Sequence, residues 1–297
     1  MRLVHFATQS TPSPRPGLQI DGGVLDLTHA TCELPTATHA MAWFDMDADC
    51  LRSALALGRE PERVAKLARG SAFVPEAEVC LHSPVPRPGK VLCIGLNYRD
   101  HARESNMDLP EEPLIFSKFS SCVVGPGAEV VLPPGSEEND YEAELGVVIG
   151  RRISRVDQQE AAAAVLGYTC VNDVSARDFQ FKDGQWQRGK SPDTFCPTGP
   201  AIVTTDECSD PHVLPIRFRL NGETLQDSNT DEIHHQIPHL VSYISQFATL
   251  EPGDLIATGT PPGVGFARKP PVYLKDGDRM EVDIEGLGVL ANPVVRR

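Results

Sequence analysis

Two glutamates, Glu142 and Glu144, lie two residues apart at the start of a run that is otherwise apolar, residues 145–149. Side chains alternate across a β-strand, so both carboxylates are expected on the same face. Adjacent acids beside an apolar run are costly unless something neutralises them. A third acid, Asp173, lies in a second strand-like run. Three carboxylates suit Mg²⁺ or Mn²⁺ and leave coordination positions for substrate and water. The alternative is a solvated edge strand that carries E-x-E by chance.

A histidine and a glutamate form a second candidate pair. If residues 99–104 begin a short helix, His101 and Glu104 are i, i+3 neighbours on one face. A carboxylate beside an imidazole orients it and can poise either group as a general base for water. The alternative is an exposed surface pair.

Three further polar side chains follow along the chain. Arg177 and Gln180, just after Asp173, are candidates for binding a substrate carboxylate. Arg177 could equally pair with Asp178 or with a metal-ligand carboxylate. Lys190 is expected in a loop between glycine and proline, where the alternative for an isolated lysine is a solvated charge.

A glycine-rich loop, residues 258–265, comes directly after a strand-like run at 255–258. Backbone N–H groups in such a loop can hold an anion. The loop lacks the G-x-x-x-x-G-K-[ST] spacing of a phosphate loop, so it does not imply a nucleotide.

The elements that must position these residues indicate a β-rich α+β chain with two domains. Residues 1–85 are expected to form a small N-terminal α/β appendage, and residues 86–297 the catalytic domain, with a proline-rich boundary between them. Asn221-Gly222 between two apolar runs predicts a β-hairpin. The other expected elements are strands at 3–6 and 18–27, helices at 47–69, 158–166 and 238–247, and a strand-turn-strand at 273–282.

Composition limits the classes of function. Lys and Arg number 27 against 41 Asp and Glu, a net charge of −14, which argues against nucleic-acid binding. The sequence has no apolar run long enough to span a membrane and no signal-peptide core at its N-terminus. Its eight cysteines include no C-x-x-C pair and several have apolar neighbours, which is typical of reduced thiols. We expect a soluble, cytoplasmic protein.

Taken together, these motifs resemble the fumarylacetoacetate hydrolase family over roughly residues 90 to 297. The matching stretches are 95–104, 141–145, 172–178, 188–191 and 250–265. The resemblance implies a mixed β-sandwich roll for the large domain, a homodimer, and one Mg²⁺ or Mn²⁺ bound by Glu142, Glu144 and Asp173. It also implies catalytic roles for three residues and substrate contacts from others. The catalytic residues are His101, Glu104 and Lys190, and the substrate-binding residues are Arg177, Gln180, Thr260 and Lys118.

One segment departs from the family. Many relatives carry an apolar run after the hairpin, where this chain has Asp231-Glu232-Ile233-His234-His235-Gln236. His234 and His235 could simply be exposed. They could instead line the end of the pocket that takes the substrate tail, which would disfavour an apolar tail.

The leading hypothesis is hydrolysis of a carbon–carbon bond in a β-diketo acid of acylpyruvate type, including sugar-derived 2,4-diketo-3-deoxy acids. Water activated by His101 and Glu104 would attack the distal carbonyl, Lys190 would stabilise the oxyanion, and a pyruvate enolate stabilised by the metal would leave. The same enolate chemistry serves oxaloacetate decarboxylation and the isomerisation or hydration of 2-oxo acids, which are the alternatives. A non-catalytic metal-binding protein is a remote alternative, since a retired site has no physical reason to keep buried charges.

Overall fold

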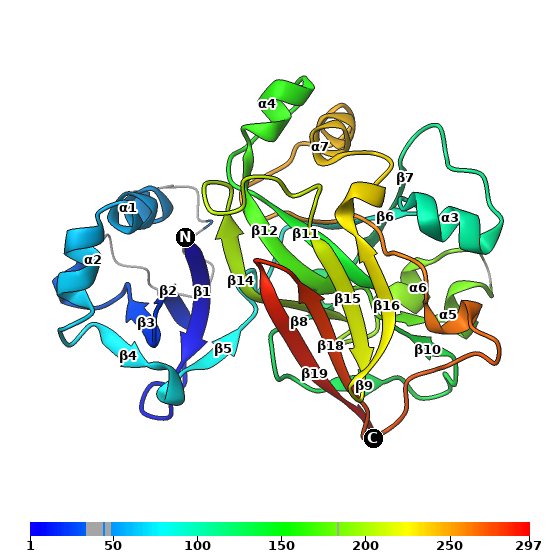
Figure 1. Cartoon of the computed structure of the whole chain (residues 1–297), viewed down its shortest axis with the longest axis horizontal. Coiled ribbons are helices and arrows are strands. Elements are labelled where there is room, and N and C mark those ends of the chain that lie inside the picture. Colours follow the sequence, from blue (N-terminus) through cyan, green and yellow to red (C-terminus); the bar gives the residue numbers. More distant parts are fainter. Residues whose placement is uncertain (34–43, 45–48, 183) are drawn as a thin grey trace.

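The computed structural model describes residues 1–33, 44, 49–182 and 184–297 of the chain (Figure 1). Within this part the fold is β-rich, with a 12-stranded sheet, a 5-stranded sheet and a two-stranded ribbon. The expected β-rich α+β class is therefore confirmed. None of the described helices is both long and apolar enough to cross a membrane.

The 12-stranded sheet runs in the order β4-β3-β2-β1-β14-β12-β11-β17-β6-β7, with β5 paired to β1 and β8 to β14. Its strands are β1 (Arg2–Ala7), β2 (Arg15–Ile20), β3 (Gly23–Asp26), β4 (Phe73–Pro75), β5 (Cys80–His82), β6 (Val91–Gly95), β7 (Leu114–Lys118), β8 (Val123–Val124), β11 (Ala143–Ile149), β12 (Val165–Asn172), β14 (Cys196–Thr204) and β17 (Leu255–Ala257). The central strands β11 and β12 are buried at every position, which explains their nearly continuous apolar sequence.

The five-stranded sheet runs in the order β16-β15-β18-β19-β9 and packs its inner face against β11 and β12. Its strands are β9 (Val130–Leu132), β15 (Pro215–Leu220), β16 (Glu223–Asn229), β18 (Arg279–Ile284) and β19 (Gly288–Arg296). Burial alternates along β15 and β18, as expected for strands with one solvated face. Between the two sheets the rings of Tyr141 and Phe218 stack 4.0 Å apart. The ribbon consists of β10 (Asn139–Asp140) and β13 (Ser175–Ala176).

The Asn221-Gly222 hairpin is confirmed, since both residues adopt the left-handed conformation that a tight two-residue turn requires, with φ of 53° and 85°. The α-helices are α1 (Asp49–Gly58), α2 (Pro61–Leu67), α3 (Arg99–Ser105), α4 (Gln158–Ala162), α5 (Arg177–Gln180), α6 (Gln187–Lys190) and α7 (Ile237–Ser245). The 3₁₀ helices are η1 (Ala30–Cys32), η2 (Glu76–Glu78), η3 (Ser120–Cys122), η4 (Thr230–Glu232) and η5 (Gly265–Ala267).

Two expected elements differ from the structure. The helix predicted at 158–166 ends at Ala162, because the chain enters β12 at Val165, which pairs with Ile149 of β11. The strand-turn-strand predicted at 273–282 contains only β18, whose partner is β19 further along the chain. In both cases strand pairing overrides the local pattern: β12 pairs across the large sheet, and β18 forms a hairpin with the strand that follows it. The start of the helix predicted at 47–69 lies outside the described residues.

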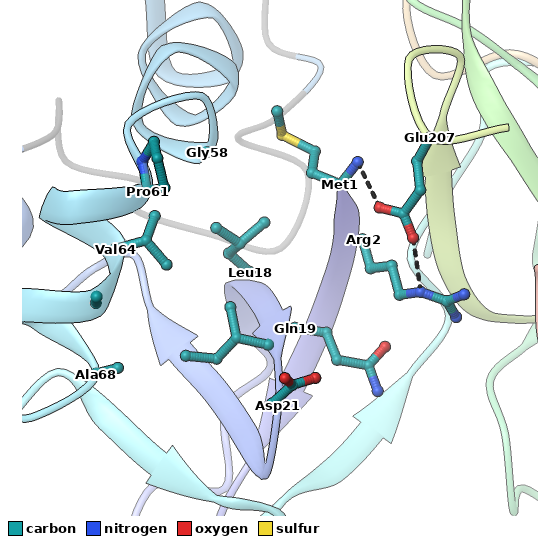
Figure 2. Close-up of a pocket in the computed structure, with 12 residues that line it drawn as sticks. Met1, Arg2, Leu18, Gln19, Asp21, Gly58, Pro61, Val64, Ala68 and Glu207 are labelled. Atoms are coloured by element: carbon teal, nitrogen blue, oxygen red, sulfur yellow. Dashed lines mark hydrogen bonds and ion pairs between the residues drawn. The ribbon is translucent and has the colours of Figure 1, made fainter. Parts of the chain in front are cut away.

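The N-terminal strands continue the large sheet, because β1 pairs with β14. Helices α1 and α2 lie beside these strands at one side of the molecule (Figure 1). Glu207, after β14, holds the start of the chain: its carboxylate lies 2.7 Å from the Met1 amine and 3.0 Å from Arg2 Nε (Figure 2). The domain boundary at residue 85 stays a prediction.

Candidate active site

The carboxylates of Glu142, Glu144 and Asp173 meet at the end of the two central strands. Glu142 directly precedes β11, Glu144 is its second residue, and Asp173 follows the last residue of β12. Antiparallel pairing places Ala143 opposite Asn172, and the Asp173 amide donates to the Glu142 carbonyl at 2.9 Å. One oxygen of each carboxylate lies within 4.8 Å of the others, and all three residues are buried. The structure thus brings together the three acids that the sequence singled out.

This trio fits a hard divalent cation. Burial raises the pKa of Glu144 well above its ordinary value, and the nearby charges of Asp173 and Glu142 raise it further. Glu144 accepts a hydrogen bond from Gly259 N at 2.8 Å, but no described ion pair reaches it. A buried carboxylate of this kind needs a compensating positive charge to be ionised, and oxygen donors are the ligands that Mg²⁺ and Mn²⁺ prefer.

Two buried lysines contact the trio. Lys190 Nζ donates to Glu142 Oε2 at 2.7 Å and to Asp173 Oδ2 at 2.8 Å, and the residue is 1% exposed. Lys190 was expected in a loop, but it is the last residue of α6 and is not a solvated charge. Gly189 lets this helix approach closely, because a side chain there would begin 2.6 Å from the Ala176 carbonyl. Lys118 Nζ donates to Asp173 Oδ1 at 2.6 Å and to the Val174 carbonyl at 3.0 Å.

Opposing effects fix the charge of Glu142. Burial alone would raise its pKa, but the charges of Lys190 and Arg177 outweigh burial and lower the pKa of Glu142 to about 2. Burial would likewise lower the pKa of Lys118, but the Asp173 carboxylate raises it above its ordinary value. Lys118 therefore stays charged.

Arg177 pairs with carboxylates of the protein itself. Its guanidinium donates to Asp140 Oδ2 at 2.9 Å, to Glu142 Oε1 at 2.6 Å and to Gln180 Oε1 at 3.0 Å. Of the alternatives that the sequence left open, pairing with a carboxylate of the candidate metal trio, Glu142, is the one observed. Asp178 instead accepts hydrogen bonds from the Ser136 hydroxyl and from backbone amides. Asp140 was not predicted as a site residue, although it lies two residues before Glu142 and is fully buried.

His101 and Glu104 lie one helical turn apart on α3, as expected. His101 Nδ1 is 3.4 Å from Glu104 Oε2, a long contact for a hydrogen bond. Gly263 N donates to both Glu104 oxygens, at 3.1 and 3.2 Å, so the carboxylate is held from two sides. The pair is partly exposed to solvent.

The amides of the glycine-rich loop do bind carboxyl oxygens, and in this structure these belong to side chains of the protein. Its amides at Gly259, Gly263 and Gly265 donate to Glu144, Glu104 and Asp140 respectively. Gly259 and Gly263 need φ values of 103° and 97°, which only glycine adopts readily. One rigid loop therefore positions three separate carboxylates. Within it, the Thr260 hydroxyl donates to the Ala143 carbonyl at 2.9 Å and accepts a hydrogen bond from Gln226.

A cavity of about 290 Å³ lies against these groups. Its polar lining residues are His101, Glu142, Glu144, Arg177, Gln180, Lys190 and Thr260. The rest of its lining is mostly apolar and aromatic: Ile94, Gly95, Leu96, Met107, Leu114, Phe116, Phe181, Trp186 and Phe266. Lys118 contacts the trio without lining this cavity. The apolar wall was not predicted, because its residues come from five separate segments that only the fold brings together.

A larger hollow of about 780 Å³ lies elsewhere, between the N-terminal strands and α2 (Figure 2). Leu18, Val64 and Ala68 form part of its wall, and its Met1 amine and Arg2 are paired with Glu207. No metal-binding group of acids, cysteines or histidines is found there among the described residues. The chemistry is therefore expected at the smaller cavity.

His234 and His235 fit neither of the two expectations. His235 is 7% exposed, and its Nε2 lies 3.0 Å from the Pro110 carbonyl oxygen, while His234 is half-buried beside it. Neither residue lines the cavity at the carboxylates. Asn97 instead holds this segment in place. Its side chain accepts a hydrogen bond from His235 N and donates one to the His235 carbonyl.

Comparison with known proteins decides the family. Residues 90–295 match the family described as Fumarylacetoacetate (FAA) hydrolase C-terminal. The chain belongs to the fumarylacetoacetate hydrolase family. A Rattus norvegicus relative, called oxaloacetate tautomerase Fahd2a, mitochondrial, is 46% identical over 99% of this chain and 92% of its own length.

Solved structures agree with this assignment. One is 5-carboxymethyl-2-hydroxymuconate delta-isomerase from Mycobacterium smegmatis, 36% identical, with a TM-score of 0.76 over 100% of this chain and 99% of that one. Another is maleylpyruvate hydrolase from a Sphingobium species, 33% identical, with a TM-score of 0.74 over 100% of both chains. The relatives named here are all enzymes, so the remote non-catalytic alternative finds no support among them.

The expected cytoplasmic localisation is contradicted, since the rat relative is a mitochondrial protein by name. The seven described cysteines are free thiols, in agreement with the expected reduced state. Thiol state and composition report on redox conditions and solubility, and they do not distinguish one reducing compartment from another.

Proposed function

We propose that the protein catalyses the keto–enol tautomerisation of oxaloacetate or of a closely similar 2-oxo acid. The observation that carries the proposal is a single cavity that is lined both by two of the metal-ligand carboxylates and by His101. The rat relative's name supports the choice among the family's reactions, because that protein matches this chain over nearly its whole length.

Glu142, Glu144 and Asp173 would hold the cation, and we propose Mg²⁺ or Mn²⁺ from the all-oxygen donor set. When bound, such a cation supplies Lewis-acid polarisation of a carbonyl oxygen. The protein's own residues would do the rest. His101, oriented by Glu104, would move a proton at the carbon next to the 2-oxo group. Lys190 would donate a hydrogen bond toward the oxygen on which charge develops.

From enol to keto, tautomerisation removes one proton from oxygen and adds one to carbon, and it needs neither water nor bond cleavage between carbons. It can be followed as decay of the enol absorbance of oxaloacetate in the presence of Mg²⁺ or Mn²⁺, with pyruvate measured in parallel. We expect enol loss without pyruvate. Pyruvate release in step with oxaloacetate loss would replace the tautomerase with a decarboxylase, the alternative raised by the sequence.

Carbon–carbon hydrolysis of an acylpyruvate is the second candidate, and the apolar wall favours it. Phe116, Trp186 and Phe266 offer a surface that the acyl tail of such a substrate can cover, whereas a four-carbon dicarboxylate has no apolar tail to place there. His234 and His235 lie outside the cavity, so they do not disfavour an apolar tail there. Release of pyruvate and acetate in equal amounts from acetylpyruvate, lost in a Glu104→Gln variant, would identify this activity.

We also propose that the protein is a homodimer, as the family resemblance implies. Light scattering coupled to size-exclusion chromatography tests this directly, because a monomer has a mass of 32.3 kDa.

A further inference from the structure

Asp140 is the most heavily hydrogen-bonded carboxylate near the site. Its Oδ1 accepts from Tyr141 N at 2.8 Å and from Gly265 N at 2.6 Å. Its Oδ2 accepts from Arg177 Nε at 2.9 Å and from Phe266 N at 3.1 Å. The residue is fully buried and does not line the cavity. Neither the candidate metal ligands nor the proposed catalytic residues by themselves require a charge at Asp140.

Two sets of contacts connect Asp140 to the cavity. The first runs through Arg177, which bridges Asp140 and the metal-ligand carboxylate of Glu142. The second runs through the backbone of residues 265–266 to Phe266, whose ring lies in the cavity wall and 4.4 Å from the Arg177 guanidinium. Gly265 is required for this approach, because a side chain there would begin 2.5 Å from Asp140 Oδ1 and 2.0 Å from the Val272 carbonyl. Both sets meet again at Arg177.

We propose that Asp140 is a positioning residue that holds Arg177 against Glu142 and balances its charge, so that Glu142 stays available to a divalent cation. The same carboxylate holds Phe266 over the guanidinium as a wall of the substrate cavity. This proposal rests on the metal site of the proposed function and does not depend on which 2-oxo acid is the substrate.

The charge count explains why Asp140 matters to a cation it does not touch. When Glu144 is ionised, as it would be beside a bound cation, the buried cluster has one more negative charge than positive charges. Its acids are Asp140, Glu142, Glu144 and Asp173, and its cations are Lys118, Arg177 and Lys190. Without the charge of Asp140, Glu142 is the only remaining negative partner of Arg177. The negative and positive charges of the cluster are then equal in number, and its net attraction for a cation is lost. Buried charges are weakly screened, so the change acts over the short distances involved.

Asp140→Asn tests the proposal, because the amide keeps the size of the side chain but loses its charge. We expect the dissociation constant for Mn²⁺, measured by titration calorimetry, to rise by roughly 10–100-fold, the usual effect of losing a group that supports the metal ligands without binding the metal. Asp178→Asn is the matched control. Asp178 lies next to Arg177 in the chain and also accepts backbone and hydroxyl hydrogen bonds, but it makes no contact with the guanidinium. Its Mn²⁺ affinity is expected to stay at the wild-type value.

The double variant Asp140→Asn/Arg177→Gln distinguishes a loss of metal affinity caused by the missing charge from a loss caused by misfolding. The double variant restores the original excess of one carboxylate, so its Mn²⁺ affinity should return toward the wild-type value, whereas a folding defect would be deepened by the second change. If Asp140→Asn does not fold, Arg177→Gln alone serves instead, because it leaves the cluster with two more carboxylates than cations. The Mn²⁺ dissociation constant should then fall below the wild-type value, and an unchanged or raised constant overturns the proposal.

A wild-type dissociation constant in folded Asp140→Asn, or an equal weakening in Asp178→Asn, overturns the proposal. Because the readout is metal affinity, it is separable from the reaction. A weakened Mn²⁺ affinity in Asp140→Asn supports the role of Asp140 even if the wild-type protein leaves oxaloacetate enol unchanged, and that second result would overturn only the proposed substrate.

Discussion

Glu142 connects the candidate metal site to two buried cations, since it accepts hydrogen bonds from Lys190 and from Arg177. Replacing it with alanine removes one metal ligand and leaves both cations short of a partner. We expect Glu142→Ala to lose bound Mn²⁺ in elemental analysis and to lower the free energy of unfolding by about 3–5 kcal/mol, the cost of breaking a buried pair. Urea denaturation measures the second effect.

Glu137→Ala is the control for this variant, because Glu137 is an exposed acid whose ion pair is with Arg296 at the surface. It should keep its metal and lose less than about 1 kcal/mol. Full metal content in Glu142→Ala would remove Glu142 from the set of ligands.

Lys190 is the residue best placed to stabilise negative charge on a substrate, because it lines the cavity and is held by two carboxylates. We expect Lys190→Ala to lower kcat for enol loss roughly 100–1,000-fold, as for removal of an oxyanion donor, with a smaller change in KM. Steady-state kinetics on oxaloacetate enol measure both constants. Lys182→Ala, an exposed lysine of the same region, is the control. An unchanged kcat in Lys190→Ala would mean that another group stabilises the charge.

At the scale of elements, the glycine-rich loop aligns α3 with the two central strands, because its amides reach Glu104 as well as Glu144. Gly263 can be tested against a glycine of similar conformation. A side chain at Gly263 would begin 2.1 Å from the Leu225 carbonyl, whereas Gly277, with φ of 86°, has no atom within 4 Å of that position.

Gly277→Ala is expected to lose about 1 kcal/mol of stability from its backbone conformation alone, with normal activity. Gly263→Ala should lose more, and its kcat should also fall because the amide that holds Glu104 moves. Urea denaturation and initial rates compare the two variants. Equal losses of stability and of kcat in the two variants would show that the close packing at Gly263 does not determine the geometry of the His101–Glu104 pair.

At the scale of the whole molecule, the buried His5 of the N-terminal strands makes folding sensitive to pH. It lies in β1 opposite His82 of β5 and is fully buried. Burial lowers the pKa of His5 from 6.5 to about 4, although hydrogen bonds with the backbone of Ser83 and Pro84 oppose the shift. The unfolded chain therefore takes up a proton near pH 6.5 that the folded protein takes up only near pH 4.

The contribution of His5 is fully present above pH 6.5 and is lost as the pH falls toward 4, with a total of about 3 kcal/mol. We expect a His5→Leu variant to show a shallower decline of unfolding free energy across this interval than the wild-type protein. Urea denaturation at a series of pH values gives both curves. Parallel curves would contradict a role for His5.

Local patterns determined much of this protein. The Asn221-Gly222 turn, helix α7 and the shared face of Glu142 and Glu144 follow from conformational preferences within a few residues. The order of the motifs along the chain indicated the family, because the polar residues of each motif lie close together in the sequence. The apolar central strands likewise follow from burial on both faces.

Only the tertiary structure decided which charges meet. Arg177 pairs with Asp140, 37 residues away, and not with its neighbour Asp178. Lys190 became a buried cation because α6 packs beside β13. Contacts between distant segments also determined which carboxylates accept hydrogen bonds from the loop amides. They likewise determined which residues form the apolar wall of the cavity. A sequence pattern shows which face an element buries, but the partner of a buried charge depends on which other element arrives there.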